Sequence, residues 1–128
     1  MPCHIEERDE GRGLLRVWTG VVTGSDVIAA IDDYRTTVNL TKLEYIIADH
    51  EGVTAFEATA DEIREVAKAD ARLAELKPHL VIALVAPTDI VFGLARMWEV
   101  FTERPGWSAR VFRSRPEAEA WVHESLGG

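Results

Sequence analysis

The chain has 128 residues, of which 47% are hydrophobic. This is enough for one folded domain with its own core and too little for two domains of ordinary size, so we expect a single domain over residues 1–128. Fourteen Lys and Arg against 22 Asp and Glu give a net charge of −8. A negative surface repels phosphate groups, which argues against nucleic acid as a partner and against binding to anionic membranes.

The sequence also predicts where the protein resides. The only cysteine, Cys3, cannot form a disulfide within the chain, which fits a reducing compartment. The N-terminal residues lack the apolar core of a signal peptide. The longest apolar run, Leu80–Ala86, is far shorter than a bilayer span. We therefore expect a cytoplasmic protein without membrane insertion.

The predicted elements begin with two short strands, His4–Arg8 and Leu14–Thr19, joined by a turn at residues 11–13 as an antiparallel hairpin. Strand-like stretches then alternate with helix-like ones. Four predicted strands start 29, 37 and 27 residues apart, at Leu14, Leu43, Leu80 and Trp107. Such lengths suit strand–helix units that return the chain to a parallel strand. Leu80–Ala86 is apolar at every position, which predicts a fully buried central strand.

Capping residues predict the helix ends. Starts are expected at Thr23 or Ser25, at the capping box Thr59–Glu62, at Thr88 or Asp89, and at a second capping box, Ser114–Glu117. The third helix is expected to run to about Arg104, before a Pro-Gly pair. The element order is ββαβαβαβα. This order predicts an α/β fold with a mostly parallel sheet, one antiparallel N-terminal strand, and helices on both faces.

Two stretches resemble a known family. Residues 46–60 (IIADHEGVTAFEATA) resemble the strand-to-helix junction of STAS domains, the sulphate transporter and anti-sigma factor antagonist family. Residues 86–97 (APTDIVFGLARM) resemble a turn and helix in a bacterial STAS/SEC14-like subgroup of small stand-alone proteins. The resemblance covers essentially the whole chain. It implies one antiparallel strand beside four parallel strands wound as a superhelix of strand–helix units.

The resemblance also suggests a regulatory residue. In anti-sigma factor antagonists a phosphorylated serine opens the second helix, and Thr59 is the only hydroxyl at the matching place. A phosphate there would face a favourable helix N-terminus but also acidic neighbours, among them Asp61 and Glu62, that repel it. We interpret Thr59 mainly as an N-cap and keep the phospho-acceptor role as the alternative.

A rim of polar residues is expected where the parallel strands end. Asp49 and His50 end one predicted strand and Thr54 follows them, while Asp89 follows the next strand and Arg96 lies two turns into the third helix. This set could anchor an anionic ligand. The alternative, which we favour, is an ion pair between Asp49 and Arg96 that closes the sheet, with Asp89 as a helix cap.

The third predicted helix carries more apolar residues than one buried stripe needs. Phe92, Met97 and Val100 project away from the stripe formed by Val91, Leu94, Trp98 and Phe101. We interpret these three residues as a self-association surface, so the expected partner is a second copy of the chain.

Nothing in the sequence signals a metal site, a cofactor or a catalytic motif. The four histidines lack ligand spacing, and Cys3 has no local base. The favoured function is therefore a non-catalytic interaction or regulatory module of STAS type, as a homodimer. A carrier of a small anionic or lipid-like ligand, bound at the carboxyl ends of the parallel strands, is the alternative. SEC14 domains that enclose lipids are considerably larger than this chain, and an enzyme built on Asp49, His50 and Arg96 ranks last.

Overall fold

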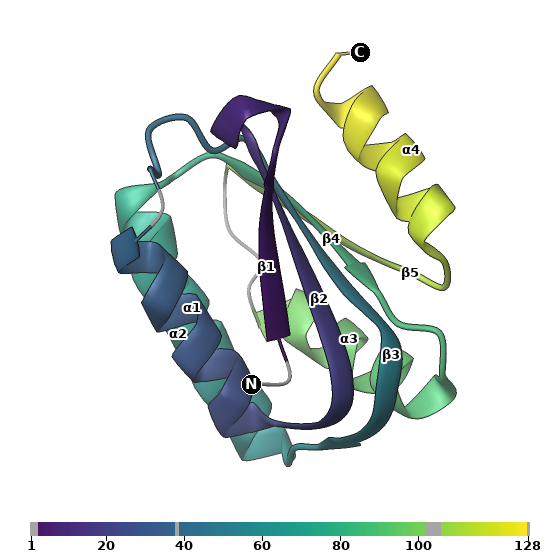
Figure 1. The fold of residues 1–128 in the computed structure, drawn as a ribbon. Helices are drawn as coiled ribbons and strands as arrows, with labels where there is room; N and C mark the ends of the chain where they lie inside the picture. The colour runs from purple at the N-terminus through teal and green to yellow at the C-terminus, as the bar shows by residue number, and fades with distance from the viewer. Residues whose placement is uncertain (1–2, 38, 102–105, 128) are drawn as a thin grey trace.

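The computed structural model describes residues 3–37, 39–101 and 106–127, and shows a five-stranded sheet with helices on both faces (Figure 1). The strands are β1 (Cys3–Arg8), β2 (Gly13–Thr23), β3 (Tyr45–Glu57), β4 (Leu80–Val85) and β5 (Trp107–Phe112). The helices are α1 (Gly24–Thr37), α2 (Ala60–Leu76), α3 (Asp89–Phe101) and α4 (Arg115–Ser125), with one turn of 3-10 helix, η1 (Asp9–Gly11). The predicted order of strands and helices and the predicted fold class are confirmed.

The strands lie in the sheet in chain order, β1 to β5. β1 is antiparallel to β2, and the other neighbouring strands are parallel. The middle strand is thus β3, whereas the sequence analysis gave that place to β4. β4 is nevertheless buried along its length except at Val81, which is half-buried, because β3 and β5 flank it and helices cover both of its faces.

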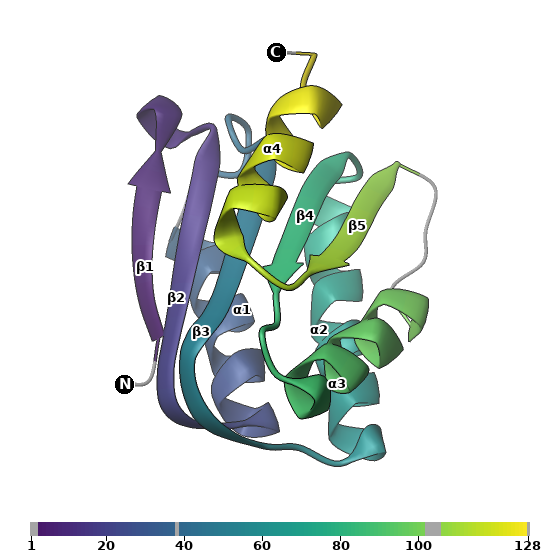
Figure 2. The same cartoon turned by 90° about the vertical axis from the view of Figure 1, so that its right-hand side faces the viewer.

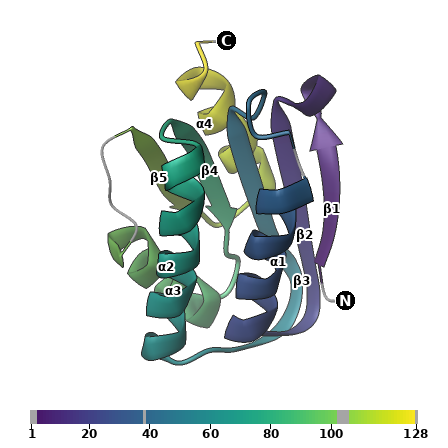
Figure 3. The same ribbon diagram turned by 90° about the vertical axis from the view of Figure 1, so that its left-hand side faces the viewer.

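Three helices cover one face of the sheet and a single helix covers the other. α1 and α2 lie side by side along one face, with α3 next to α2 (Figure 3). α4 crosses the opposite face over β3, β4 and β5 (Figure 2). Successive strand residues point to opposite faces: Ile46 packs in the large core under the three helices, and Ile47 packs in the smaller core under α4.

β2 and β3 run further than the predicted strands Leu14–Thr19 and Leu43–Ala48. Pairing between β3 and β4 ends at Asp49, and from there β3 pairs with β2 alone. Register shifts in this outer part mark β-bulges, which bend the pair around α1. Gly52 therefore lies inside a strand and not in a turn. Its hydrogen allows close packing, since a Cβ would lie 2.9 Å from Thr19 Cγ2.

Threonine caps begin the first three helices as predicted. Thr23 Oγ1 accepts from the Asp26 amide at 3.2 Å, and Thr88 Oγ1 accepts from the Val91 amide at 3.3 Å. The predicted capping box at Ser114 is wrong: its hydroxyl donates to Glu117 Oε1 at 2.8 Å and caps no amide of α4. The predicted end of the third helix near Arg104 lies outside the described residues.

Candidate functional site

The outer side of α3 leaves large apolar side chains exposed. Val91, Ala95 and Trp98 recur at helical spacing and are buried against the sheet and α2. On the other side of the helix, Ile90 is 71% exposed and Val100 is 63% exposed. Among the described residues these are the two most exposed large hydrophobic side chains. Gly93, Arg96 and the half-buried Met97 complete the outer side of α3.

The three predicted interface residues differ in exposure. Val100 is exposed, but Phe92 and Met97 are half-buried and pack against the main core. The guanidinium of Arg113 also covers the Phe92 ring, 4.1 Å from its centroid. The sequence analysis missed Ile90, although its position seven residues before Met97 places both on one side of the helix.

Arg96 does not reach the strand ends. Its side chain is 60% exposed, and its Nε lies 3.6 Å from Oε1 of Glu99 on the same helix. The predicted ion pair between Arg96 and Asp49 is therefore wrong. Two turns into α3, Arg96 points outward, because Val91, Ala95 and Trp98 occupy the side that faces the sheet.

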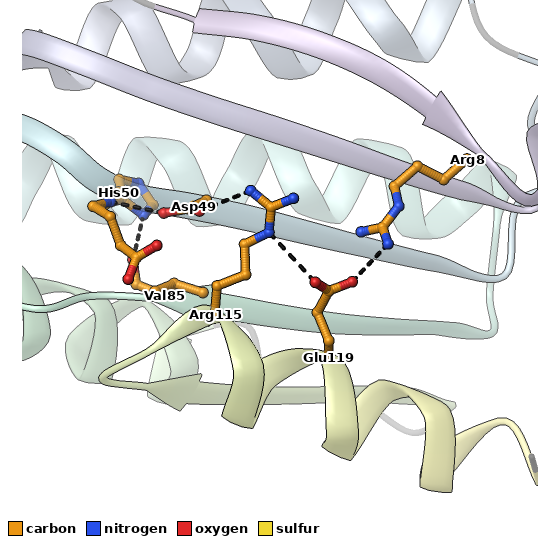
Figure 4. A network of polar contacts seen from close by, with 7 residues as sticks. Arg8, Asp49, His50, Val85, Arg115 and Glu119 are labelled. Atoms are coloured by element: carbon orange, nitrogen blue, oxygen red, sulfur yellow. Dashed lines mark hydrogen bonds and ion pairs between the residues drawn. The ribbon is translucent and has the colours of Figure 1, made fainter.

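Asp49 lies on the other face of the sheet, beneath α4. Its Oδ2 pairs with Arg115 at 3.3 Å, and its Oδ1 accepts from the Glu51 amide at 2.8 Å. Arg115 also pairs with Glu119 at 3.5 Å, and Glu119 pairs with Arg8 of β1 at 2.6 Å (Figure 4). We call Arg8, Asp49, Arg115 and Glu119 the α4 network. The sequence analysis did not find it, because its members are far apart in the chain.

The remaining rim residues do not converge. Thr54 is exposed on the outer part of β3. Asp89 is exposed and pairs with Arg113 at 3.0 Å. Its predicted role as a helix cap is wrong, because Asp89 lies inside α3 and the hydroxyl of Thr88 accepts from the Val91 amide. Thr59 Oγ1 accepts from the Glu62 amide at 3.2 Å, and Glu62 Oε1 accepts from the Thr59 amide at 3.0 Å. The predicted capping box is confirmed, and phosphorylation of Thr59 stays a prediction.

His50 points away from Asp49, into the core under the three helices. Its Nδ1 lies 3.1 Å from the Val85 carbonyl oxygen (Figure 4). The imidazole is parallel to the Trp18 indole, with centroids 6.2 Å apart. Burial, and next the positive charge of Arg16, lower the pKa of His50 to about 4. His50 is therefore neutral at pH 7, and Nδ1–H donates to Val85.

His50 lines a cavity of about 50 Å³ between the sheet and helices α1, α2 and α3. Most of its lining is apolar, but Arg16, His50 and Asp70 are each less than a tenth exposed. Asp70 Oδ2 accepts from the indole Nε1 of Trp98 at 2.6 Å. Arg16 and Asp70 were missed by the sequence analysis. Each is a charged residue at a core-facing position of a strand or helix pattern, which is the signal that could have found them.

Across residues 3–37, 39–101 and 106–127, no group of three or more His, Cys, Asp or Glu side chains is placed to hold a metal ion. In the same part of the chain, no helix has both the length and the apolar character needed to span a bilayer.

Solved structures share this arrangement of strands and helices. An uncharacterised DUF3478 family protein from Shewanella loihica PV-4, with a SpoIIAA-like fold, superposes with a TM-score of 0.55 and 16% identity, over 94% of this chain and 91% of that one. The unphosphorylated anti-sigma factor antagonist SpoIIAA superposes with a TM-score of 0.62 and 13% identity, over 95% and 96% of the two chains.

The phosphorylated form of SpoIIAA, the Bacillus cell fate determinant, gives a TM-score of 0.55 and 14% identity over 94% of this chain and 98% of that one. No protein-family model matches the sequence, and no curated protein matches it either. At these identities the likeness establishes the fold alone. The chain has the SpoIIAA-like, STAS-like fold that its motifs indicated.

Proposed function

We propose that this protein is a non-catalytic interaction module of the STAS type that associates with a second copy of itself through the outer side of α3. The observation that supports it is the exposure of Ile90 and Val100, at 71% and 63%, on the same helix; among the described residues they are the two most exposed large hydrophobic side chains. Large apolar side chains gathered on one surface are typical of interaction sites. Burying each one contributes at most about 1.5–3 kcal/mol before the cost of association.

Charge does not prevent this association. The net charge of −8 makes two copies repel each other at long range, but ions screen that repulsion within about a nanometre at physiological salt. On the contact itself the charged Arg96 is paired with Glu99. We therefore expect added salt to strengthen the association, because it weakens the repulsion and leaves an apolar contact intact.

Sedimentation of purified protein tests the proposal. The unmodified protein should be a dimer at tens of micromolar, and Val100→Glu should convert it to a folded monomer, because the substitution places a charge in the contact. Val21→Glu is the matched control: Val21 is also exposed, at 52%, but lies on β2, so it adds the same charge outside the contact. A monomeric unmodified protein, or a dimer that survives Val100→Glu, would reject self-association through α3.

The cavity favours binding of a small ligand as a second candidate function. A volume of about 50 Å³ is a third of the roughly 150 Å³ that accommodates benzene. The site therefore fits a ligand of a few non-hydrogen atoms, and a long-chain lipid does not fit. Native mass spectrometry of the freshly purified protein tests this function. A bound mass that is lost when Arg16 is changed to Leu would support it, and the bare mass of the chain would count against it.

A further inference from the structure

Gly93 lies in the middle of α3, and the described part of the chain offers no steric reason for a glycine there. Glycine is among the least favourable residues in a helix interior. At two other positions its use has a steric reason: a Cβ at Gly13 would overlap the Tyr45 ring, and one at Gly24 would lie 2.9 Å from Glu62 Cβ. Beyond the chain neighbours of Gly93 and the backbone of α3 itself, a Cβ at this position would meet no atom of the described residues within 4 Å. Gly93 also has no positive φ, so the backbone does not require it.

The neighbours of Gly93 on the outer side of α3 recur at a regular spacing. Ile90, Gly93, Met97 and Val100 are separated by three, four and three residues, the spacing of residues that line one contact between two helices. In an antiparallel pair centred on residue 95, position 90 lies opposite position 100 of the other copy. In the same pair, position 93 lies opposite position 97.

Resting on the proposed self-association, we infer that two copies pair through antiparallel α3 helices, with Met97 of each copy packed over Gly93 of the other. The missing side chain at Gly93 leaves a notch, and methionine is flexible enough to fill an irregular gap. The same pairing buries Ile90 against Val100 of the second copy. Both of the most exposed apolar side chains are then covered.

A second copy fits this face better than an unrelated partner because the face is complementary to itself. A two-fold axis brings each residue i of one copy against residue j of the other, and j against i. The outer side of α3 carries both the notch, Gly93, and the side chain that fills it, Met97. Its exposed cation, Arg96, is paired with Glu99 of the same helix, so the two identical faces do not meet as like charges.

Gly93→Ala gives the sharpest test, because the substitution is expected to stabilise the folded monomer and to weaken the dimer. The new Cβ has open space in the monomer and improves helix propensity. The variant should therefore unfold at a higher urea concentration than the unmodified protein when both are diluted to monomers. In the dimer the same Cβ collides with Met97 of the second copy. The dissociation constant from sedimentation should rise at least tenfold.

A double-mutant cycle tests whether the weaker dimerisation of Gly93→Ala depends on the Met97 side chain. In a Met97→Ala background the facing side chain is shorter, so Gly93→Ala should change the dissociation constant less than threefold. Ala120→Leu, which adds a larger side chain to an exposed position on α4, is the control and should leave dimerisation unchanged.

The outcomes separate this inference from the proposed function. If Val100→Glu dissociates the dimer but Gly93→Ala leaves its dissociation constant unchanged, self-association through α3 stands and the antiparallel pairing over Gly93 is rejected. An equal effect of Gly93→Ala with and without Met97→Ala also rejects the pairing. If the unmodified protein is a monomer, both self-association through α3 and the antiparallel pairing over Gly93 are rejected.

Discussion

The charged groups on the two faces of the sheet differ in their exposure to solvent. Under the three helices α1, α2 and α3, Arg16, His50 and Asp70 lie in a mostly apolar cavity and are almost fully buried. Under α4, Arg8, Arg115 and Glu119 lie at the edge of the contact with 30%, 34% and 38% of their side chains exposed, and of the α4 network only Asp49 is buried.

This difference determines what each face responds to. Water screens the charges at the edge of α4, so their ion pairs add little stability and weaken as salt is added. No water layer screens the groups around the cavity, so each must keep its polar partners, and a change of protonation there is costly. We therefore expect the cavity face to be sensitive to pH and to substitution, and the α4 face to be sensitive to salt.

The largest expected effect is from Asp70→Ala. The substitution removes the acceptor of the buried Trp98 indole N–H, and a buried donor that loses a charged acceptor costs about 3 kcal/mol. Urea denaturation should show this loss in the free energy of unfolding. Glu65→Ala is the matched control on α2. Glu65 is exposed and pairs with Lys68 at 3.0 Å, so this substitution should cost about 0.5 kcal/mol or less. Equal losses for both variants would contradict the comparison between buried and exposed charges.

A smaller effect is expected from pH, through His50. The pKa of His50 is about 4 in the folded protein, against about 6.5 for a histidine in an unfolded chain. Below pH 6.5 the unfolded chain therefore binds a proton that the folded chain does not. The contribution of the neutral His50 to the free energy of unfolding is therefore complete above pH 6.5, and it is lost as the pH falls from 6.5 toward 4. At pH 5 the loss is about 2 kcal/mol relative to pH 7.5.

His50→Gln isolates this contribution from those of the carboxylates. The difference in unfolding free energy between the variant and the unmodified protein should shift by about 2 kcal/mol from pH 7.5 to pH 5, in favour of the variant. A difference that does not depend on pH would show that His50 does not titrate below its usual range.

The smallest effect is expected on the α4 face. Glu119→Gln removes two partly exposed ion pairs, with Arg8 and Arg115, and should cost about 0.5–1 kcal/mol at low salt. In molar sodium chloride the cost should fall toward zero, because both pairs are screened. A loss that persists in high salt would mean that the α4 network acts as a buried network.

Much of the fold was predictable because its signals are local. The capping hydroxyls of Thr23, Thr59 and Thr88 act within three residues of their own position. The outer halves of β2 and β3 were not predictable in this way. Their pairing beyond Asp49 depends on register shifts and on the close approach of Gly52 to Thr19, neither of which follows from a local pattern of residues.

The candidate sites show the same difference between local signals, which the sequence reveals, and contacts between residues far apart in the chain, which it does not. Val100 could be identified from the sequence because a surplus of apolar residues on one helix is a periodic, local pattern. The partner of Asp49 could not, because Arg115 lies 66 residues further along the chain. Asp49 and His50 were expected together at one rim because the strand was predicted to end there. β3 continues past both residues, so as consecutive strand residues they point to opposite faces of the sheet.

The sequence by itself determined the order of strands and helices and the helix starts. These depend on hydrophobic periodicity and on hydrogen bonds between residues a few positions apart. Only the tertiary structure decided which charged groups meet: Asp49 with Arg115 under α4, Asp70 with Trp98 beside the cavity, and Arg96 with its own helix and not with the sheet. Ion pairs and buried hydrogen bonds act over a few ångströms of space, and the spatial distance between residues far apart in the chain is set by how the helices pack on the sheet.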